Sequence, residues 1–129
     1  MPLVTIETRR GLSPETKAQL FDAVHQALMT AFKIPAHDRT QRVLEYADAD
    51  FEIPPGRGPR YMLVSIEAFA GRSLDAKRNL YREIATRFEA TGIPRTDVFI
   101  VLKEIPVENW GLRGGIAACD LDLGFNVRV

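Results

Sequence analysis

Leu3-Val4-Thr5-Ile6-Glu7 returns, at an offset of 60 residues, as Leu63-Val64-Ser65-Ile66-Glu67, and this repeated stretch decides the fold. Each copy largely alternates apolar and polar side chains, which is the pattern of a half-buried strand. Further matches follow at an offset of 59 or 60 residues: Gly11, Ser13 and Lys17 with Gly71, Ser73 and Lys77, Ile34-Pro35 and Asp38 with Ile93-Pro94 and Asp97, and Glu45 with Glu104. The matches predict that the chain is an internal duplication.

Each half of the duplication predicts a strand, a helix and a second strand. Ser13 and Ser73 are good N-cap residues, and Pro14 stands at a first helical position, where proline is favoured. The predicted elements are strands over 2–8, 40–46, 61–69 and 98–102, and helices that begin after Ser13 and Ser73. Because β-α-β crossovers are right-handed and join parallel strands, two such units predict an α/β fold with a four-stranded sheet and both helices on one face.

The chain is predicted to be a single domain. The first repeat spans 2–46, a Pro- and Gly-rich surface linker spans 47–60, the second repeat spans 61–104, and a tail spans 105–129. The tail ends in a strand-like apolar run over 121–129, which could join a neighbouring subunit and cover a site.

One face of the predicted sheet has no helical cover. That face would carry Val4, Ile6, Val64 and Ile66, or the residues that alternate with them. A large apolar sheet face is rarely left to water. The sequence therefore predicts an oligomer, specifically a homotrimer, that packs its sheet faces around an axis.

Composition excludes several classes of function. The formal net charge is zero, which argues against nucleic-acid or membrane-surface partners. Cys119 is the single cysteine, and no apolar run is long enough to span a membrane, so a cytoplasmic protein is expected. With two histidines and no ligand-spaced cluster, the sequence predicts neither a metal site nor a cofactor.

Pro2 directly precedes the first predicted strand. Removal of the initiator Met would leave Pro2 as a secondary amine, and an α-amino group has an ordinary pKa of about 7.7–8.0. Burial or a nearby charge can move that pKa to where the amine works as a base, an acid or a nucleophile. The alternative is that Pro2 only begins an edge strand, where its missing N–H is harmless.

An amino-terminal proline on a duplicated chain of this length resembles the tautomerase superfamily, and the resemblance covers nearly the whole chain. Ile34-Pro35-Ala36-His37-Asp38-Arg39-Thr40-Gln41 resembles the helix-to-strand segment of malonate semialdehyde decarboxylases, which have a catalytic aspartate where Asp38 stands. Ala70-Gly71-Arg72-Ser73 resembles the stretch with their substrate-binding arginine, and Asn109-Trp110-Gly111 resembles their pocket-lining tryptophan segment. The family fold is a trimer of duplicated β-α-β chains.

The resemblance implies the site residues: Pro2, Asp38 and Arg72 as catalytic residues, and Phe69, Trp110, Leu112 and Arg113 as substrate-binding residues. Arg72 would bind a substrate carboxylate beside a helix N-terminus. Asp38 would orient the reacting group or hold Pro2 protonated, and Trp110 would exclude water. Phe69 and Ala70 stand where many members have a second arginine, so Arg113 or Arg39 is the candidate for a second cation.

Structural explanations of the same residues remain open. Asp38 repeats as Asp97, so it could be a turn or cap residue, and Trp110 could belong to the core. Two functions follow. The first is an enzyme acting on a small oxo-acid, either a decarboxylase (a lyase) or a keto-enol tautomerase (an isomerase), with possible hydratase activity. The second is a non-catalytic trimer of the same fold with a binding or structural role.

Overall fold

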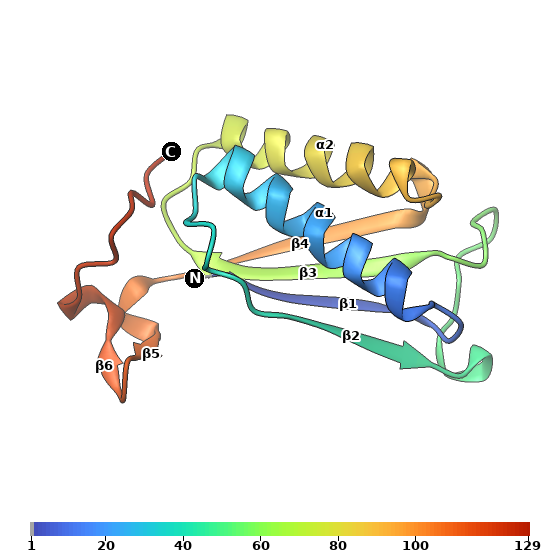
Figure 1. Cartoon of the computed structure of the whole chain (residues 1–129), viewed down its shortest axis with the longest axis horizontal. Coiled ribbons are helices and arrows are strands. Elements are labelled where there is room, and N and C mark those ends of the chain that lie inside the picture. Colours follow the sequence, from blue (N-terminus) through green and yellow to red (C-terminus); the bar gives the residue numbers. More distant parts are fainter. Residues whose placement is uncertain (1) are drawn as a thin grey trace.

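The computed structural model describes residues 2–129 and has a mixed four-stranded sheet with two helices on one face (Figure 1). The elements are β1 (Leu3–Arg9), α1 (Pro14–Phe32), β2 (Gln41–Tyr46), β3 (Met62–Phe69), α2 (Leu74–Ala90) and β4 (Val98–Ile105). The strand order is β2-β1-β3-β4, with β1 parallel to β2, β3 parallel to β4, and β1 antiparallel to β3. The predicted duplicated β-α-β fold is confirmed, and β4 continues beyond the predicted end at residue 102.

Both helices begin as their sequences predict. The Ser13 hydroxyl accepts a hydrogen bond from the Thr16 N–H, and the Ser73 hydroxyl accepts one from the Ala76 N–H, each at 3.1 Å. These bonds satisfy backbone donors that have no partner within the helix. The chain leaves α1 through Lys33, whose left-handed φ of 57° turns it towards the loop before β2.

In each half, a lysine–glutamate ion pair, called the clamp below, holds the loop between the first strand and the helix. Glu45 accepts bonds from the Gly11 N–H and pairs with Lys17, and Glu104 accepts a bond from the Gly71 N–H and pairs with Lys77. The hydrogen bond from Lys17 and those from the loop N–H groups outweigh burial and lower the pKa of Glu45. Because both halves have the clamp, it serves the fold.

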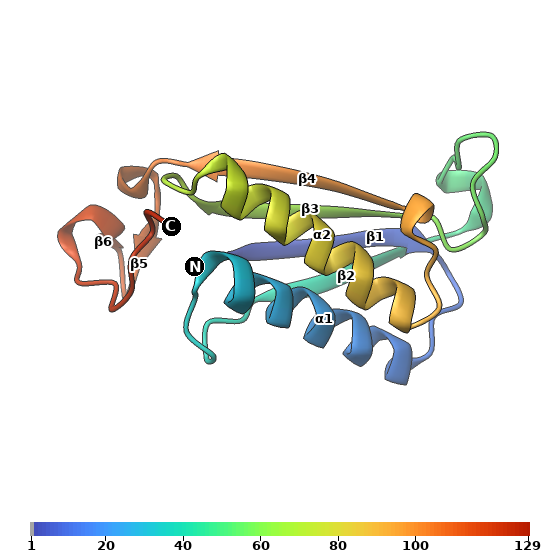
Figure 2. The same ribbon diagram turned by 90° about the horizontal axis from the view of Figure 1, so that it is seen from above.

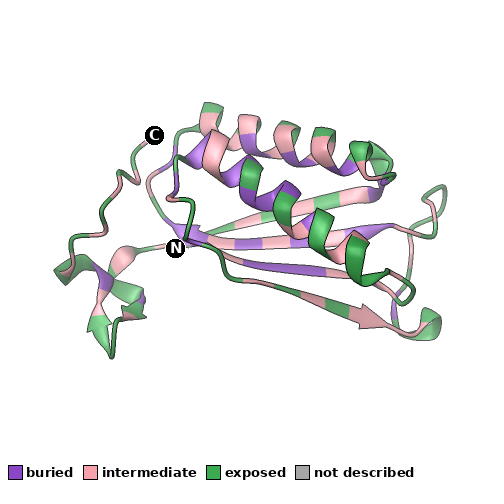
Figure 3. Ribbon diagram, in the orientation of Figure 1, coloured by how far each residue is buried: buried purple, intermediate pink, exposed green. Residues whose placement is uncertain are grey.

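The core lies between the sheet and the helices. Val4, Ile6, Val64 and Ile66 are fully buried there against α1 and α2, so the uncovered face carries the alternate residues. Figure 3 shows buried residues along the central strands β1 and β3 and also along α1, which packs on them. The uncovered face carries the exposed apolar side chains of Leu44, Phe99 and Val101.

The tail forms a hairpin and then returns to the second repeat. Strands β5 (Gly111–Leu112) and β6 (Ile116–Ala117) make the hairpin, which lies beyond the end of the sheet where β1 starts (Figure 2). The chain then runs back until the Ser73 N–H donates to the Val129 carbonyl at 3.0 Å.

Residues 121–129 form no strand within this chain, although their alternation predicts one, and pairing of the run with a neighbouring subunit stays a prediction. Asp122 and Asn126 accept hydrogen bonds from backbone N–H groups two residues ahead, and such local bonds compete with strand pairing. The apolar side chains of the run pack against Phe69 and Trp110 of the same chain. In residues 2–129, neither helix is both long and apolar enough to cross a bilayer.

Candidate active site

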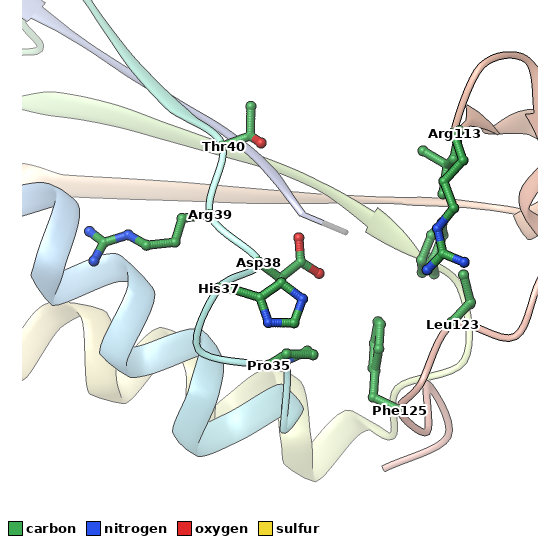
Figure 4. A pocket seen from close by; sticks show the side chains of 10 residues that line it. Pro35, His37, Asp38, Arg39, Thr40, Arg113, Leu123 and Phe125 are labelled. Carbon is green, nitrogen blue, oxygen red and sulfur yellow. The ribbon is translucent and has the colours of Figure 1, made fainter.

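A pocket of about 310 Å³ lies at the end of the sheet where β1 starts and β3 ends. The loop before β2 forms one wall, and the end of β3 with the C-terminal segment forms the other (Figure 4). The lining residues are Pro35, His37, Asp38, Arg39 and Thr40 from the loop, and Phe69, Leu112, Arg113, Leu123 and Phe125 from the opposite wall.

Pro2 is buried immediately before β1, beside this pocket. The Val4 N–H donates to the carbonyl of the lining residue Thr40 at 3.0 Å, and Leu3 packs in the apolar cluster around Phe69. The start of β1 is therefore flanked by both walls, although Pro2 itself is not among the described lining residues. Met1, whose removal would free the Pro2 amine, lies outside the described residues.

Asp38 is a buried carboxylate in the pocket wall, with 8% of its surface exposed. Its N–H donates to the Pro35 carbonyl at 3.1 Å, and the His25 ring bonds the Ala36 carbonyl at 2.8 Å, so the loop is held at two points. Figure 4 shows the Asp38 carboxylate directed into the pocket.

Asp97, the equivalent of Asp38 in the second repeat, has different surroundings. It is also buried, and its two carboxylate oxygens accept hydrogen bonds from the Gly58 N–H at 3.1 and 3.3 Å. Asp97 thus anchors the linker, whereas Asp38 faces a pocket. The duplication explains why both repeats have an aspartate in this turn. It does not explain why Asp38 borders a pocket.

Arg72 is 7% exposed and lies in the short loop between the end of β3 and the start of α2. Its Nη1 donates to the Phe69 carbonyl at 2.8 Å, and its guanidinium carbon lies 4.7 Å from the centre of the Phe32 ring. Burial lowers the pKa of Arg72, while the charges of Glu104 and Asp38 raise it. The described lining of the pocket does not include Arg72, and its buried Nε has no partner among residues 2–129.

Aromatic side chains stack behind and along the second wall. Phe69 lies edge-on to Trp110 with ring centres 4.9 Å apart, and its ring is nearly parallel to Phe125 at 6.4 Å. The Trp110 indole N–H donates to the Ile105 carbonyl at 3.2 Å, which fixes the ring. Trp110 therefore supports the lining residue Phe69 from behind and, within the described part of the chain, does not itself line the pocket.

A family model described as tautomerase enzyme matches residues 38–113, and a second model with the same description matches residues 2–53. The first match alone covers more than half of the chain. The protein is a member of the tautomerase family. Among curated relatives of this tautomerase-family chain, probable tautomerase YusQ of Bacillus subtilis (strain 168) is 28% identical over 123 residues, covering 91% of this chain and 97% of YusQ.

Solved structures agree with this membership. FG41 malonate semialdehyde decarboxylase, inhibited by 3-bromopropiolate, is 28% identical with a TM-score of 0.82, covering 89% of this chain and 92% of that one. A malonate semialdehyde decarboxylase with decarboxylase and hydratase activities is 26% identical with a TM-score of 0.85, covering 93% and 99%. A fused 4-OT described as a symmetric trimer is 27% identical with a TM-score of 0.81, covering 91% and 96%.

Several lining residues of this tautomerase-family pocket were not among the predicted site residues. His37, Pro35 and Thr40 come from the loop that carries Asp38, and Leu123 and Phe125 come from the tail. The alternation of apolar residues in the tail was visible in the sequence, but the wall that they form was not. No group of three potential metal ligands occurs in residues 2–129.

Proposed function

We propose that this protein is an amino-terminal-proline enzyme that acts on a small oxo-acid, in the manner of malonate semialdehyde decarboxylases, with tautomerase or hydratase activity on related substrates. The observation that carries the proposal is the buried Asp38 carboxylate in a pocket of about 310 Å³ beside Pro2. Two solved relatives described as malonate semialdehyde decarboxylases support it.

The chemistry requires the Pro2 nitrogen as a free secondary amine after removal of Met1. A neutral amine would take a proton from the carbon next to a carbonyl, which is tautomerisation. A protonated amine would polarise a carbonyl for hydration or decarboxylation. As a nucleophile the amine would form an iminium with loss of water, which accepts the electron pair when the carboxylate leaves as CO₂. Asp38 would stabilise the protonated form.

Arg72 takes a positioning role in this proposal. Its guanidinium bonds the Phe69 carbonyl and lies close enough to Asp38 for their charges to interact. A buried positive charge there offsets the cost of burying the Asp38 carboxylate. Phe69, Leu112 and the aromatic stack around Trp110 would keep water away from the reacting atoms.

We also propose that the protein assembles as a homotrimer through the uncovered face of its sheet. Leu44, Phe99 and Val101 expose apolar surface on that face. The fused 4-OT that is described as a symmetric trimer supports the trimeric state.

The test is an NMR titration of the Pro2 nitrogen together with the kinetics of Pro2→Ala, using protein whose mass shows that Met1 is absent. On a β-oxo acid and on the enol of phenylpyruvate, Pro2→Ala should lose about 10²- to 10⁴-fold in kcat/KM. Its circular dichroism should match the parent, because the change removes only part of a ring. Unchanged rates would remove Pro2 from the mechanism and favour the non-catalytic trimer.

A further inference from the structure

We infer that Arg113, at the tip of the β5–β6 hairpin, is the cation that binds the substrate carboxylate in this pocket. The inference rests on the proposed function and specifies which chemical group the second wall recognises. It assigns to Arg113 the role that the resemblance gives to Arg72.

Three arginines near the pocket differ in the partners of their guanidinium groups. Arg72 donates to the Phe69 carbonyl, lies over the Phe32 ring and is not among the described lining residues. Arg39 is paired with Asp22 at 2.8 Å, and Figure 4 shows its side chain directed away from the pocket. Arg113 lines the pocket, and its guanidinium forms no hydrogen bond or ion pair with any residue in 2–129. Of these three arginines, Arg113 is therefore the one that lines the pocket with every guanidinium donor unbonded within residues 2–129.

The backbone conformation of a tight turn holds Arg113 in place. The Gly115 N–H donates to the Leu112 carbonyl at 3.1 Å, so Arg113 and Gly114 are the central residues of a tight turn. Both have positive φ, at 49° and 83°. Turns of this kind prefer Asn-Gly, since a longer L side chain is strained at the first position. Arginine there contradicts the local preference, and such conflicts concentrate at functional sites.

The two charges of the pocket lie on different walls. Asp38 belongs to one wall and Arg113 to the other, and Figure 4 shows them on opposite sides of the hollow. Leu112, Leu123 and Phe125 make the second wall apolar around the guanidinium. A carboxylate held by Arg113 would lie away from the like charge of Asp38, which leaves the oxo group for the Asp38 and Pro2 side. Arginine suits this task because its fork of N–H donors matches a carboxylate.

The decisive variant is Arg113→Asn, because Asn tolerates the left-handed conformation while losing the charge. Its melting temperature should be equal to or higher than that of the parent. Its dissociation constant for phenylpyruvate, followed by the fluorescence of Trp110, should rise by about ten- to a hundredfold, the loss expected for a charge-assisted pair. The dissociation constant for the neutral methyl ester of phenylpyruvate should not change.

Arg57→Asn is the matched control, since Arg57 is an exposed arginine in the linker, at the other end of the sheet (Figure 1). It removes the same charge and should leave binding of the acid unchanged, whereas Arg113→Lys should retain part of it. The inference is overturned if Arg113→Asn binds the acid as the parent does, or if it weakens acid and ester equally. Should the parent bind the acid through Arg113 but turn over no oxo-acid, the proposed function fails and the carboxylate site stands.

Discussion

At the scale of single residues, two aspartates from equivalent positions of the repeats have taken different tasks. Asp97 is satisfied by the Gly58 N–H, and Asp38 faces the pocket beside the start of β1. A carboxylate near the Pro2 amine stabilises the protonated amine and raises its pKa. Asp97 is therefore an internal control for the effect of the buried Asp38 charge on the Pro2 amine.

Asp38→Asn should lower kcat by about a hundredfold and shift the pKa of the Pro2 nitrogen downwards, because it keeps the shape of the side chain and removes the anion. Kinetics and the NMR titration of Pro2 measure the two effects. Asp97→Asn is the control: it should lower the melting temperature, since it weakens the anchor of the linker, and leave the Pro2 titration unchanged. An unaltered Pro2 pKa in Asp38→Asn would separate Asp38 from the amine.

At the scale of elements, the linker that joins β2 to β3 is fixed by a close backbone approach. A Cβ added to Gly58 would lie 2.6 Å from the Oδ2 atom of Asp97, closer than such atoms approach in proteins. The buried Asp97 carboxylate can move aside only by giving up its bonds to the Gly58 N–H. Glycine is therefore required at this position for space.

Gly58→Ala should destabilise the protein by about 1–3 kcal/mol, the cost of overpacking a buried contact. Denaturant unfolding measures it, with Gly111→Ala as the control because no atom lies within 4 Å of a Cβ there and its φ is not in the left-handed region. Adding Asp97→Ala to Gly58→Ala should cost less than Asp97→Ala alone, since the clash and the bond involve the same carboxylate. Additive effects would contradict this contact.

At the scale of the whole molecule, both helices cover the same face of the sheet (Figure 1), and the other face is the one through which we propose that the trimer assembles. Phe99 on that face is 53% exposed, and Leu74 at the start of α2 is 59% exposed. Phe99→Glu should convert the proposed trimer to smaller species in sedimentation velocity, because a charge would be buried without a partner. Leu74→Glu should sediment as the parent does. A parent that is a stable monomer at micromolar concentration would refute the trimer.

The order of strands and helices could be predicted from short sequence patterns. The repeated strand pattern and the serine caps predict the order of strands and helices, because alternation and capping depend on residues only a few positions apart. The run over 121–129 shows where this fails: its alternation was that of a strand, but side-chain bonds from Asp122 and Asn126 turn the backbone back over the pocket.

The sequence by itself determined the duplication, the helix starts and the presence of Pro2, Asp38 and several arginines near one end of the sheet. Only the tertiary structure decided that Val4 and Ile6 face the helices and that Arg113 lines the pocket unbonded within residues 2–129, whereas Arg39 pairs with Asp22. Arg39 is turned away by Asp22, and Arg72 lies over Phe32. Those contacts join residues from separate elements, so the direction of each side chain is fixed when the elements pack and not before.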